Sequence, residues 1–198
     1  MKPTEAEVVA DPANASTWSI RKPSKTKSTH EVIDAPAAGG GKAARLRTEH
    51  VEGGNLMLNV GLEGGRAARK DVLAFDARGD FNVPLLCLTL RDDEGKDWVT
   101  FVDAGPEWRS HAVAFGDFVP LDAAQREAEA TVDPAKVERL QIGLDFRVLW
   151  PEKPAAFEIG RVSLAREAGG GERTAHNAKF RQPLERVGTA APEWLYDP

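Results

Sequence analysis

One glycine-rich segment of the chain carries residue types that bind nucleotides in other proteins. The glycine-rich stretch Gly39–Ala44 resembles a dinucleotide-binding fingerprint, but Ala-Pro-Ala-Ala precedes it where a buried strand is required. It also differs from a phosphate-binding loop, because Ala43 follows Lys42 where Ser or Thr would hold magnesium. We therefore expect a loop that leads into a strand at Ala44–Thr48.

Metal-binding patterns are equally incomplete. The acidic segment Asp92–Asp97 lacks the alternating acids and the distant Glu of a calcium loop, so we expect a hairpin turn. The histidines lie too far apart in sequence for a local zinc motif; they are His30, His50, His111 and His176. The sequence thus predicts neither a metal site nor a cofactor.

No local catalytic signature is present either. The chain has no G-x-S-x-G motif, and Cys87 is the only cysteine, which excludes an internal disulfide. Because Cys87 lies within an apolar run, we interpret it as a residue of the core or of a sheet. We expect the chain not to be an enzyme.

Composition excludes further classes of function. The 198 residues carry a net charge of −5, which gives no reason to expect nucleic-acid binding. No apolar run approaches the roughly 18 residues of a membrane helix, so we expect no membrane span. With 41% hydrophobic residues, the chain can bury a core and suits one domain with appendages.

Short runs of alternating apolar and polar residues separated by turns dominate the middle of the chain. This period of two is typical of half-buried strands, and the clearest runs begin at Leu56, Leu86, Arg109 and Leu140. The pattern predicts an all-β fold, an antiparallel β-sandwich or jelly roll, with one short helical insert at Asp122–Thr131. Asp133 and Pro134 are expected to cap a single turn before the Leu140 strand.

The ends of the chain differ from its middle. We expect a flexible N-terminus over residues 1–16, the sandwich over 17–166, and a linker or docking tail over 167–198. The basic run Ile20–His30 is interpreted as a solvated arm or an edge strand kept soluble by its lysines. The tail is too apolar for a pure spacer, because it contains Phe180, Leu184, Trp194, Leu195 and Tyr196.

Four segments between Val72 and Leu164 stand out: the strand Val72–Arg78, the hairpin Leu86–Asp97 with its D-x-x-G turn, the segment Trp108–Phe118, and the closing strands Val137–Leu164. Together they resemble the galactose-binding-like jelly roll of carbohydrate-binding modules attached to glycoside hydrolases. One departure concerns calcium, since Gly160 and Arg161 stand where such modules carry polar residues of a structural site. We therefore expect no calcium site on the closing strand.

The resemblance implies a non-catalytic carbohydrate-binding module that tethers a polysaccharide-active enzyme to its substrate. It also implies a secreted or cell-surface location if a leader was removed, although the N-terminus as given does not read as a secretory signal. The alternative is a structural or assembly domain of the same fold that binds protein partners through its termini.

Aromatic and polar side chains are the candidates for binding a sugar, because rings stack on pyranoses and forked groups bond to hydroxyls. The predicted ligand-binding residues are Trp150, Trp98, Arg109, His111, Arg147 and Asp145. Trp150 lies beside a proline-bounded loop, where it either stacks on a ligand or closes the end of the sandwich. Trp108 opens a strand with small alternate residues, so we expect it to fill the core between the sheets.

Overall fold

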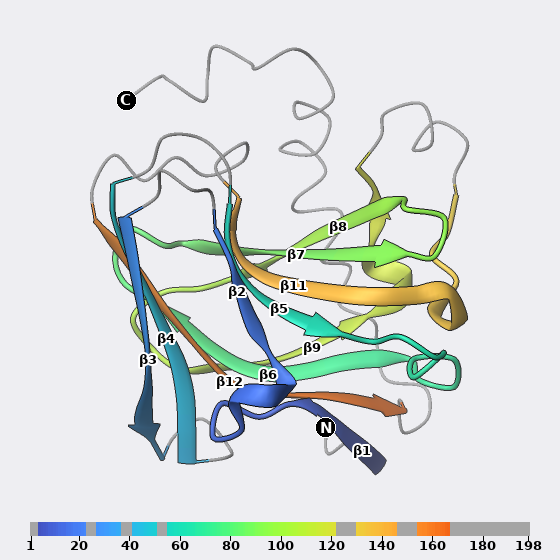
Figure 1. Cartoon of the computed structure of the whole chain (residues 1–198), viewed down its shortest axis with the longest axis horizontal. Helices are drawn as coiled ribbons and strands as arrows, with labels where there is room; N and C mark the ends of the chain where they lie inside the picture. Colours follow the sequence, from blue (N-terminus) through green and yellow to red (C-terminus); the bar gives the residue numbers. More distant parts are fainter. Residues whose placement is uncertain are drawn as a thin grey trace.

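The computed structural model describes residues 4–22, 27–36, 41–50, 55–121, 130–145 and 154–166. Within these ranges the chain forms two six-stranded sheets (Figure 1). Sheet A has the order β3 (Lys27–Ala35), β4 (Gly41–His50), β12 (Ala155–Arg166), β6 (Val72–Gly79) and β9 (Arg109–Ala114), and β1 (Thr4–Ala10) pairs with β12. Sheet B has the order β10 (Val119–Pro120), β8 (Asp97–Asp103), β7 (Leu85–Asp92), β11 (Val137–Asp145), β5 (Asn55–Gly61) and β2 (Ser19–Arg21).

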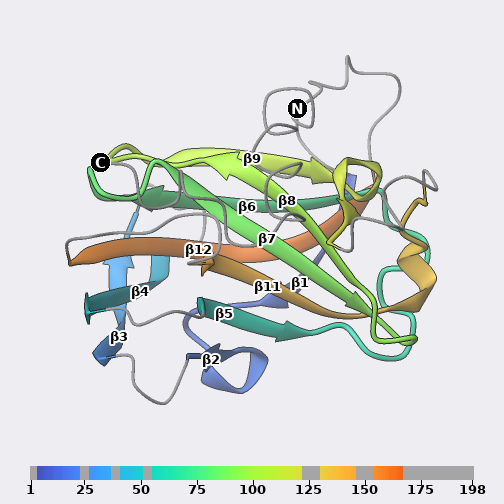
Figure 2. The same ribbon diagram turned by 90° about the horizontal axis from the view of Figure 1, so that it is seen from above.

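All of these strand pairs are antiparallel, and the two sheets pack as a sandwich. Both views place β3 and β4 at one end of the molecule (Figures 1 and 2). The described helical residues form three short 3-10 turns, which are η1 (Ala15–Thr17), η2 (Phe115–Asp117) and η3 (Pro134–Lys136). The predicted all-β antiparallel sandwich is therefore confirmed. The helical insert was predicted over Asp122–Thr131. Of these residues, 122–129 lie outside the described ranges, and 130 and 131 are not helical.

The core between the sheets is built from the apolar side of each alternating run. On sheet B the inward residues include Leu58, Leu88 and Ile142, and each is at most 1% exposed. They face Phe75 and Ile159 of sheet A within the same cluster. The alternation read from the sequence thus assigned the buried faces of these strands correctly.

The N-terminal segment is a correction to the predicted organisation. Residues Thr4–Ala10 form β1 and pair with β12, and Val9 and Ala10 are buried. This part of the N-terminus therefore belongs to sheet A and is not a flexible extension. The pairing is possible because β12 extends beyond the end of β4 and offers a free edge there. The residues of β1 alone do not show that such an edge exists.

Two predicted local structures are confirmed. In the hairpin between β7 and β8, the Asp92 carboxylate accepts hydrogen bonds from the backbone N–H groups of Glu94 and Lys96, at 3.0 and 2.8 Å. Asp133 accepts from the backbone N–H of Ala135 at 2.9 Å and begins η3, with Pro134 at its first position. No described helix is long and apolar enough to cross a membrane.

A second apolar cluster lies on the outer face of sheet B. It consists of Met57, Cys87, Val99 and Phe101, each at most 2% exposed. Cys87 therefore lies in the sheet and is buried, as its apolar surroundings in the sequence predicted. Its position opposite the main core follows from strand alternation, because Leu86 and Leu88 point inward.

The backbone around position 143 leaves no room for a side chain. A Cβ atom on Gly143, whose φ is 158°, would overlap the carbonyl oxygen of Leu56 on the neighbouring strand and lie 3.0 Å from Cζ of Phe157 in the other sheet. Backbone atoms cannot move aside as a flexible side chain does. Gly61 on the neighbouring strand differs, since its Cβ would come closest to the flexible side chain of Glu63.

We predict that Gly143→Ala lowers the free energy of unfolding by about 2–4 kcal/mol, because the added methyl group forces backbone and core to shift. The matched control Gly61→Ala should change it by less than about 1 kcal/mol. Urea denaturation followed by tryptophan fluorescence measures both values. Equal effects of the two substitutions would show that the sheets do not require glycine at position 143.

Candidate functional site

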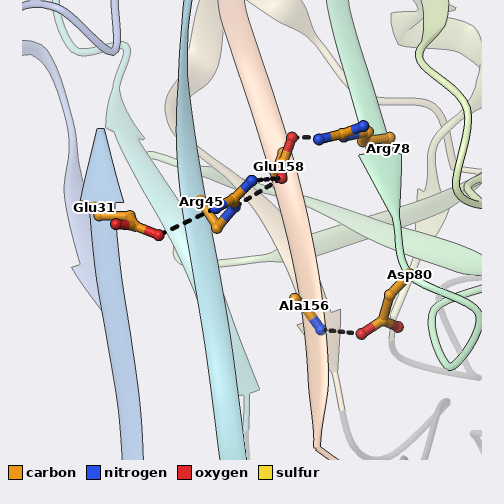
Figure 3. A network of polar contacts seen from close by, with 6 residues as sticks. All are labelled: Glu31, Arg45, Arg78, Asp80, Ala156 and Glu158. Carbon is orange, nitrogen blue, oxygen red and sulfur yellow. Dashed lines mark hydrogen bonds and ion pairs between the residues drawn. The ribbon is translucent and has the colours of Figure 1, made fainter. Parts of the chain in front are cut away.

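A row of alternating charges crosses the outer face of sheet A. Strand register places Glu31 of β3 opposite Arg45 of β4, Arg45 opposite Glu158 of β12, and Glu158 opposite Arg78 of β6. We call these four residues the charged ladder. Figure 3 shows their side chains reaching toward one another across the four strands.

Glu158 is the centre of the charged ladder. Its Oε1 accepts a hydrogen bond from Nε of Arg45 at 2.7 Å, and its Oε2 accepts one from Nε of Arg78 at 2.6 Å. Arg45 also donates through Nη1 to Oε1 of Glu31 at 3.3 Å. Each carboxylate oxygen of Glu158 is therefore engaged by a guanidinium group from a different neighbouring strand.

The contacts within the ladder favour the charged forms of Glu158 and Arg45. Burial disfavours the ionised form of Glu158, but the hydrogen bonds donated by Arg78 and Arg45 outweigh this effect and lower the pKa of the carboxyl group. The hydrogen bond to Glu158 likewise raises the pKa of Arg45. Since the Glu158 side chain is only 8% exposed, it acts mainly as the anchor that orients the two arginines.

Asp80 fixes the backbone beside the ladder, where β12 begins. Its Oδ2 accepts a hydrogen bond from the backbone N–H of Ala156 at 2.7 Å, as Figure 3 shows, and its Oδ1 accepts one from Asn82 at 2.9 Å. The Asp80 N–H in turn donates to the carbonyl of Ala156 at 2.9 Å. These bonds tie the turn after β6 to the start of β12, two residues from Glu158.

Trp108 lies next to the ladder, and its position corrects the predicted core role. The half-buried side chain packs against Ala35 and Ala43 in a small cluster apart from the main core. The guanidinium carbon of Arg78 lies 5.2 Å from its ring centroid, within the range of a cation–π contact. Trp108 therefore belongs to the outer face of sheet A, because it shares strand parity with the outward Ser110.

The outer face of sheet B carries a second polar arrangement. Arg21 donates to Oε1 of Gln141 at 3.3 Å, and Gln141 donates to Oδ1 of Asn59 at 3.3 Å. Gln141 and the predicted site residue Asp145 lie on the same side of β11, and they are 5% and 2% exposed. Burial leaves these two groups less accessible than the arginines of the charged ladder.

Trp98 does not have the position expected of a ligand platform. It is 4% exposed, belongs to the core between the sheets, and donates from Nε1 to Oδ2 of Asp92 at 3.1 Å. Its ring is covered by the core, so the prediction that it stacks on a ligand is corrected. Trp150 and Arg147 lie outside the described residues.

The remaining predicted residues do not converge on one site. Arg109 and His111 lie on β9, the edge strand of sheet A, whereas Asp145 ends β11 in sheet B. The His111 ring packs against Phe75, with 5.1 Å between centroids, and Arg109 is exposed. The charged ladder was not predicted from the sequence. Its signal was weak but present, because Arg45, Arg78 and Glu158 all occupy outward positions in strands with an alternating apolar and polar pattern.

Metal ligation finds no support among the described residues, which contain no group of three or more His, Cys, Asp or Glu side chains suited to an ion. Arg161, which stands where related modules carry polar residues, donates to Oδ2 of Asp11 at 3.0 Å. An ion pair with the segment after β1 thus occupies this position of β12.

Several solved structures share the fold. The family 11 carbohydrate-binding module of a cellulosomal cellulase of Clostridium thermocellum matches with a TM-score of 0.61 and 12% identity, over 85% of this chain and 100% of that one. A family 11 module from the same organism, in complex with a β-1,3-1,4-mixed-linked tetrasaccharide, matches with a TM-score of 0.61 and 11% identity, over 81% and 95% of the two chains. An exo-β-agarase matches with a TM-score of 0.59 and 10% identity, over 85% of this chain and 26% of that one. No family model and no curated protein matches the sequence.

These similarities show that the chain has the fold of carbohydrate-binding modules, as the resemblance in its sequence predicted.

The shared carboxylate of the ladder leads to a prediction about pH. Because the pKa of Glu158 is lowered by folding, its stabilising effect is complete above the pKa of the unfolded chain and is lost as the pH falls through the folded value. Glu158→Gln should therefore cost about 1–3 kcal/mol at pH 7, and the difference from the wild type should shrink below about pH 4. Urea unfolding at several pH values measures it.

Glu31→Gln is the matched control, because it removes a single contact at the exposed end of the same ladder. It should cost at most about 1 kcal/mol at pH 7. A Glu158→Gln effect that stays constant between pH 7 and pH 3 would contradict the assigned role of the charged carboxylate.

Proposed function

We propose that this chain is a non-catalytic carbohydrate-binding module whose ligand face is the outer face of sheet A. The observation that carries the proposal is the charged ladder beside a tryptophan ring on a sandwich of this fold. The mixed-linked tetrasaccharide bound by a structural neighbour supports the ligand class.

The chemistry of the face suits hydroxyl groups. Guanidinium groups donate in a planar fork, and carboxylates accept from two sides, so adjacent Arg and Glu side chains match neighbouring hydroxyls of a sugar. The side chains of Arg78 and Glu31 are 34% and 55% exposed, which leaves polar atoms available to a ligand. Trp108 adds apolar ring surface next to Arg78.

The proposed role is to keep a polysaccharide-active enzyme close to its substrate. Binding to an insoluble polymer raises the local concentration of a linked active site without new chemistry in the module itself. Within this proposal Trp150 and Arg147 remain predicted contributors, since they follow the strand that ends at Asp145. The alternative, an assembly domain acting through its termini, predicts no retention by polysaccharides.

We predict that the full chain is retarded during electrophoresis through gels that contain mixed-linkage β-glucan or agarose. Arg78→Ala should weaken this retention by about tenfold, because it removes a forked donor and the support of the Trp108 ring. Arg91→Ala is the control, since Arg91 forms a comparable ion pair with Asp97 on sheet B, at 2.7 Å. Its retention should match that of the wild type.

If Arg78→Ala and Arg91→Ala reduce retention equally, the assignment of the ligand face to sheet A is contradicted. Absence of retention for the wild type in every neutral polysaccharide would contradict the proposed function and favour the assembly alternative. Thermal melts of both variants separate a binding defect from a loss of folded protein.

Trp150 is tested separately. If it is a binding platform, Trp150→Ala should change the free energy of unfolding by less than about 1 kcal/mol while reducing retention on the same gels. If it closes the end of the sandwich, the substitution should cost about 3–5 kcal/mol, as expected for a large ring removed from a core. Paired denaturant melts and affinity gels distinguish the two roles.

A further inference from the structure

A basic pocket lies between the turn that joins β5 to β6 and the end of β12. Its volume is about 300 Å³, and it is lined by Gly65, Arg66, Ala68, Arg69, Lys70 and Arg166. We call these residues the basic pocket. Four of the six are cationic, on a chain whose net charge is −5.

The backbone around the pocket is held in place by the core and by strand β12. Ala67 is fully buried within the main core and anchors the turn. Gly64 and Gly65 have φ values of 77° and 71°, which other residues rarely adopt and which let the chain reverse here. Nε of Arg166 donates to the carbonyl oxygen of Arg69 at 3.1 Å and joins the turn to β12.

The pocket carries an excess of positive charge. Arg66 donates through Nε and Nη2 to a single oxygen of Glu7, at 3.1 and 2.9 Å, and this pair is partly exposed. Among the residues that the structure describes, no carboxylate forms an ion pair with Arg69 or Arg166. Two guanidinium groups of different segments are thus close enough to line one pocket and are available to an anion.

We infer that the basic pocket binds an anionic substituent of a polysaccharide, either a sulfate ester or a uronate carboxylate. A carboxylate is planar and a sulfate ester is tetrahedral, but each presents a pair of oxygens that an arginine can bind through two parallel hydrogen bonds. The inference rests on the proposed function insofar as the anion is carried by a saccharide. It adds a second contact, because the pocket is separate from the charged ladder.

The basic pocket and the charged ladder lie at different positions along β12. Glu158 and Arg166 lie eight positions apart on β12, a distance of about 26 Å at 3.3 Å per residue. Arg166 lies two positions after the inward Leu164, so it has the opposite parity from the outward Glu158. The pocket would therefore bind its anion independently of the charged ladder, and the saccharide carrier of that anion is taken from the proposed function.

The test compares three polysaccharides by affinity electrophoresis of the full chain: carrageenan, which is sulfated, polygalacturonate, which is carboxylated, and neutral mixed-linkage β-glucan. Arg69→Ala/Arg166→Ala should lower the affinity for the anionic polymers by about tenfold, as expected for the loss of charge-assisted contacts, with β-glucan retention unchanged. Lys22→Ala/Lys27→Ala is the control, since it removes the same charge from two exposed positions elsewhere. It should behave as the wild type.

The outcomes separate the possible sources of the anion. Retention by carrageenan alone assigns a sulfate ester, retention by polygalacturonate alone assigns a carboxylate, and retention by both assigns their shared chemistry. Equal losses in the two double variants, or no retention by either anionic polymer, would overturn the inference. Arg69→Ala alone serves if melts show that the double variant is unfolded.

The same gels distinguish this inference from the proposed function. If anionic polymers retain the chain through the pocket, but β-glucan does not retain it and Arg78→Ala has no effect, the pocket is supported as a binding site and the ladder face is contradicted. If β-glucan retains the chain through Arg78, but no anionic polymer retains it through the pocket, the ladder face is supported and the pocket is contradicted.

Discussion

The packing of Phe157 between the two sheets is the constraint on which both the core and the outer face of sheet A depend. The ring of Phe157, from sheet A, reaches within 3.0 Å of the position that a Cβ atom at residue 143 would occupy. Phe157 is 1% exposed and lies inward. Because successive side chains of a strand face opposite sides, seating Phe157 in the core turns Glu158 outward. Core packing thus sets the position of the carboxylate that organises the charged ladder.

The ladder gains from sharing one carboxylate between two arginines. A single exposed ion pair contributes about 0–1 kcal/mol, because water and salt screen it and both side chains lose freedom. Glu158 is largely buried and accepts hydrogen bonds from Arg45 on one side and Arg78 on the other. One ordered carboxylate therefore fixes both guanidinium groups. Arg78 is thereby held beside Trp108. Under the proposed function, donors that are already ordered lose less entropy on binding.

Features that depend on residues close in sequence could be predicted, whereas contacts that depend on the register between distant strands could not. Alternation identified the inward faces of β5, β7 and β11, and turn chemistry identified the Asp92 hairpin and the Asp133 cap. The ladder joins Arg45 and Arg78 to a residue 113 and 80 positions further along the chain. No local pattern encodes such pairings. Strand β1 was missed for the same reason, since its partner is the last described strand.

Trp98 and Trp108 show why alternation alone does not assign an aromatic ring to a face. Trp98 lies just after the turn of the β7–β8 hairpin, and its pairing with the inward residue Leu90 shows that its side chain faces the core. Trp108 precedes β9, and its small neighbours suggested a ring between sheets, whereas the small residues that receive it are Ala35 and Ala43 on the outer side. The pairing of a strand with its neighbour therefore decides whether a tryptophan fills the core or borders a polar surface. In this chain that pairing leaves Trp108, and not Trp98, beside exposed hydrogen-bonding groups.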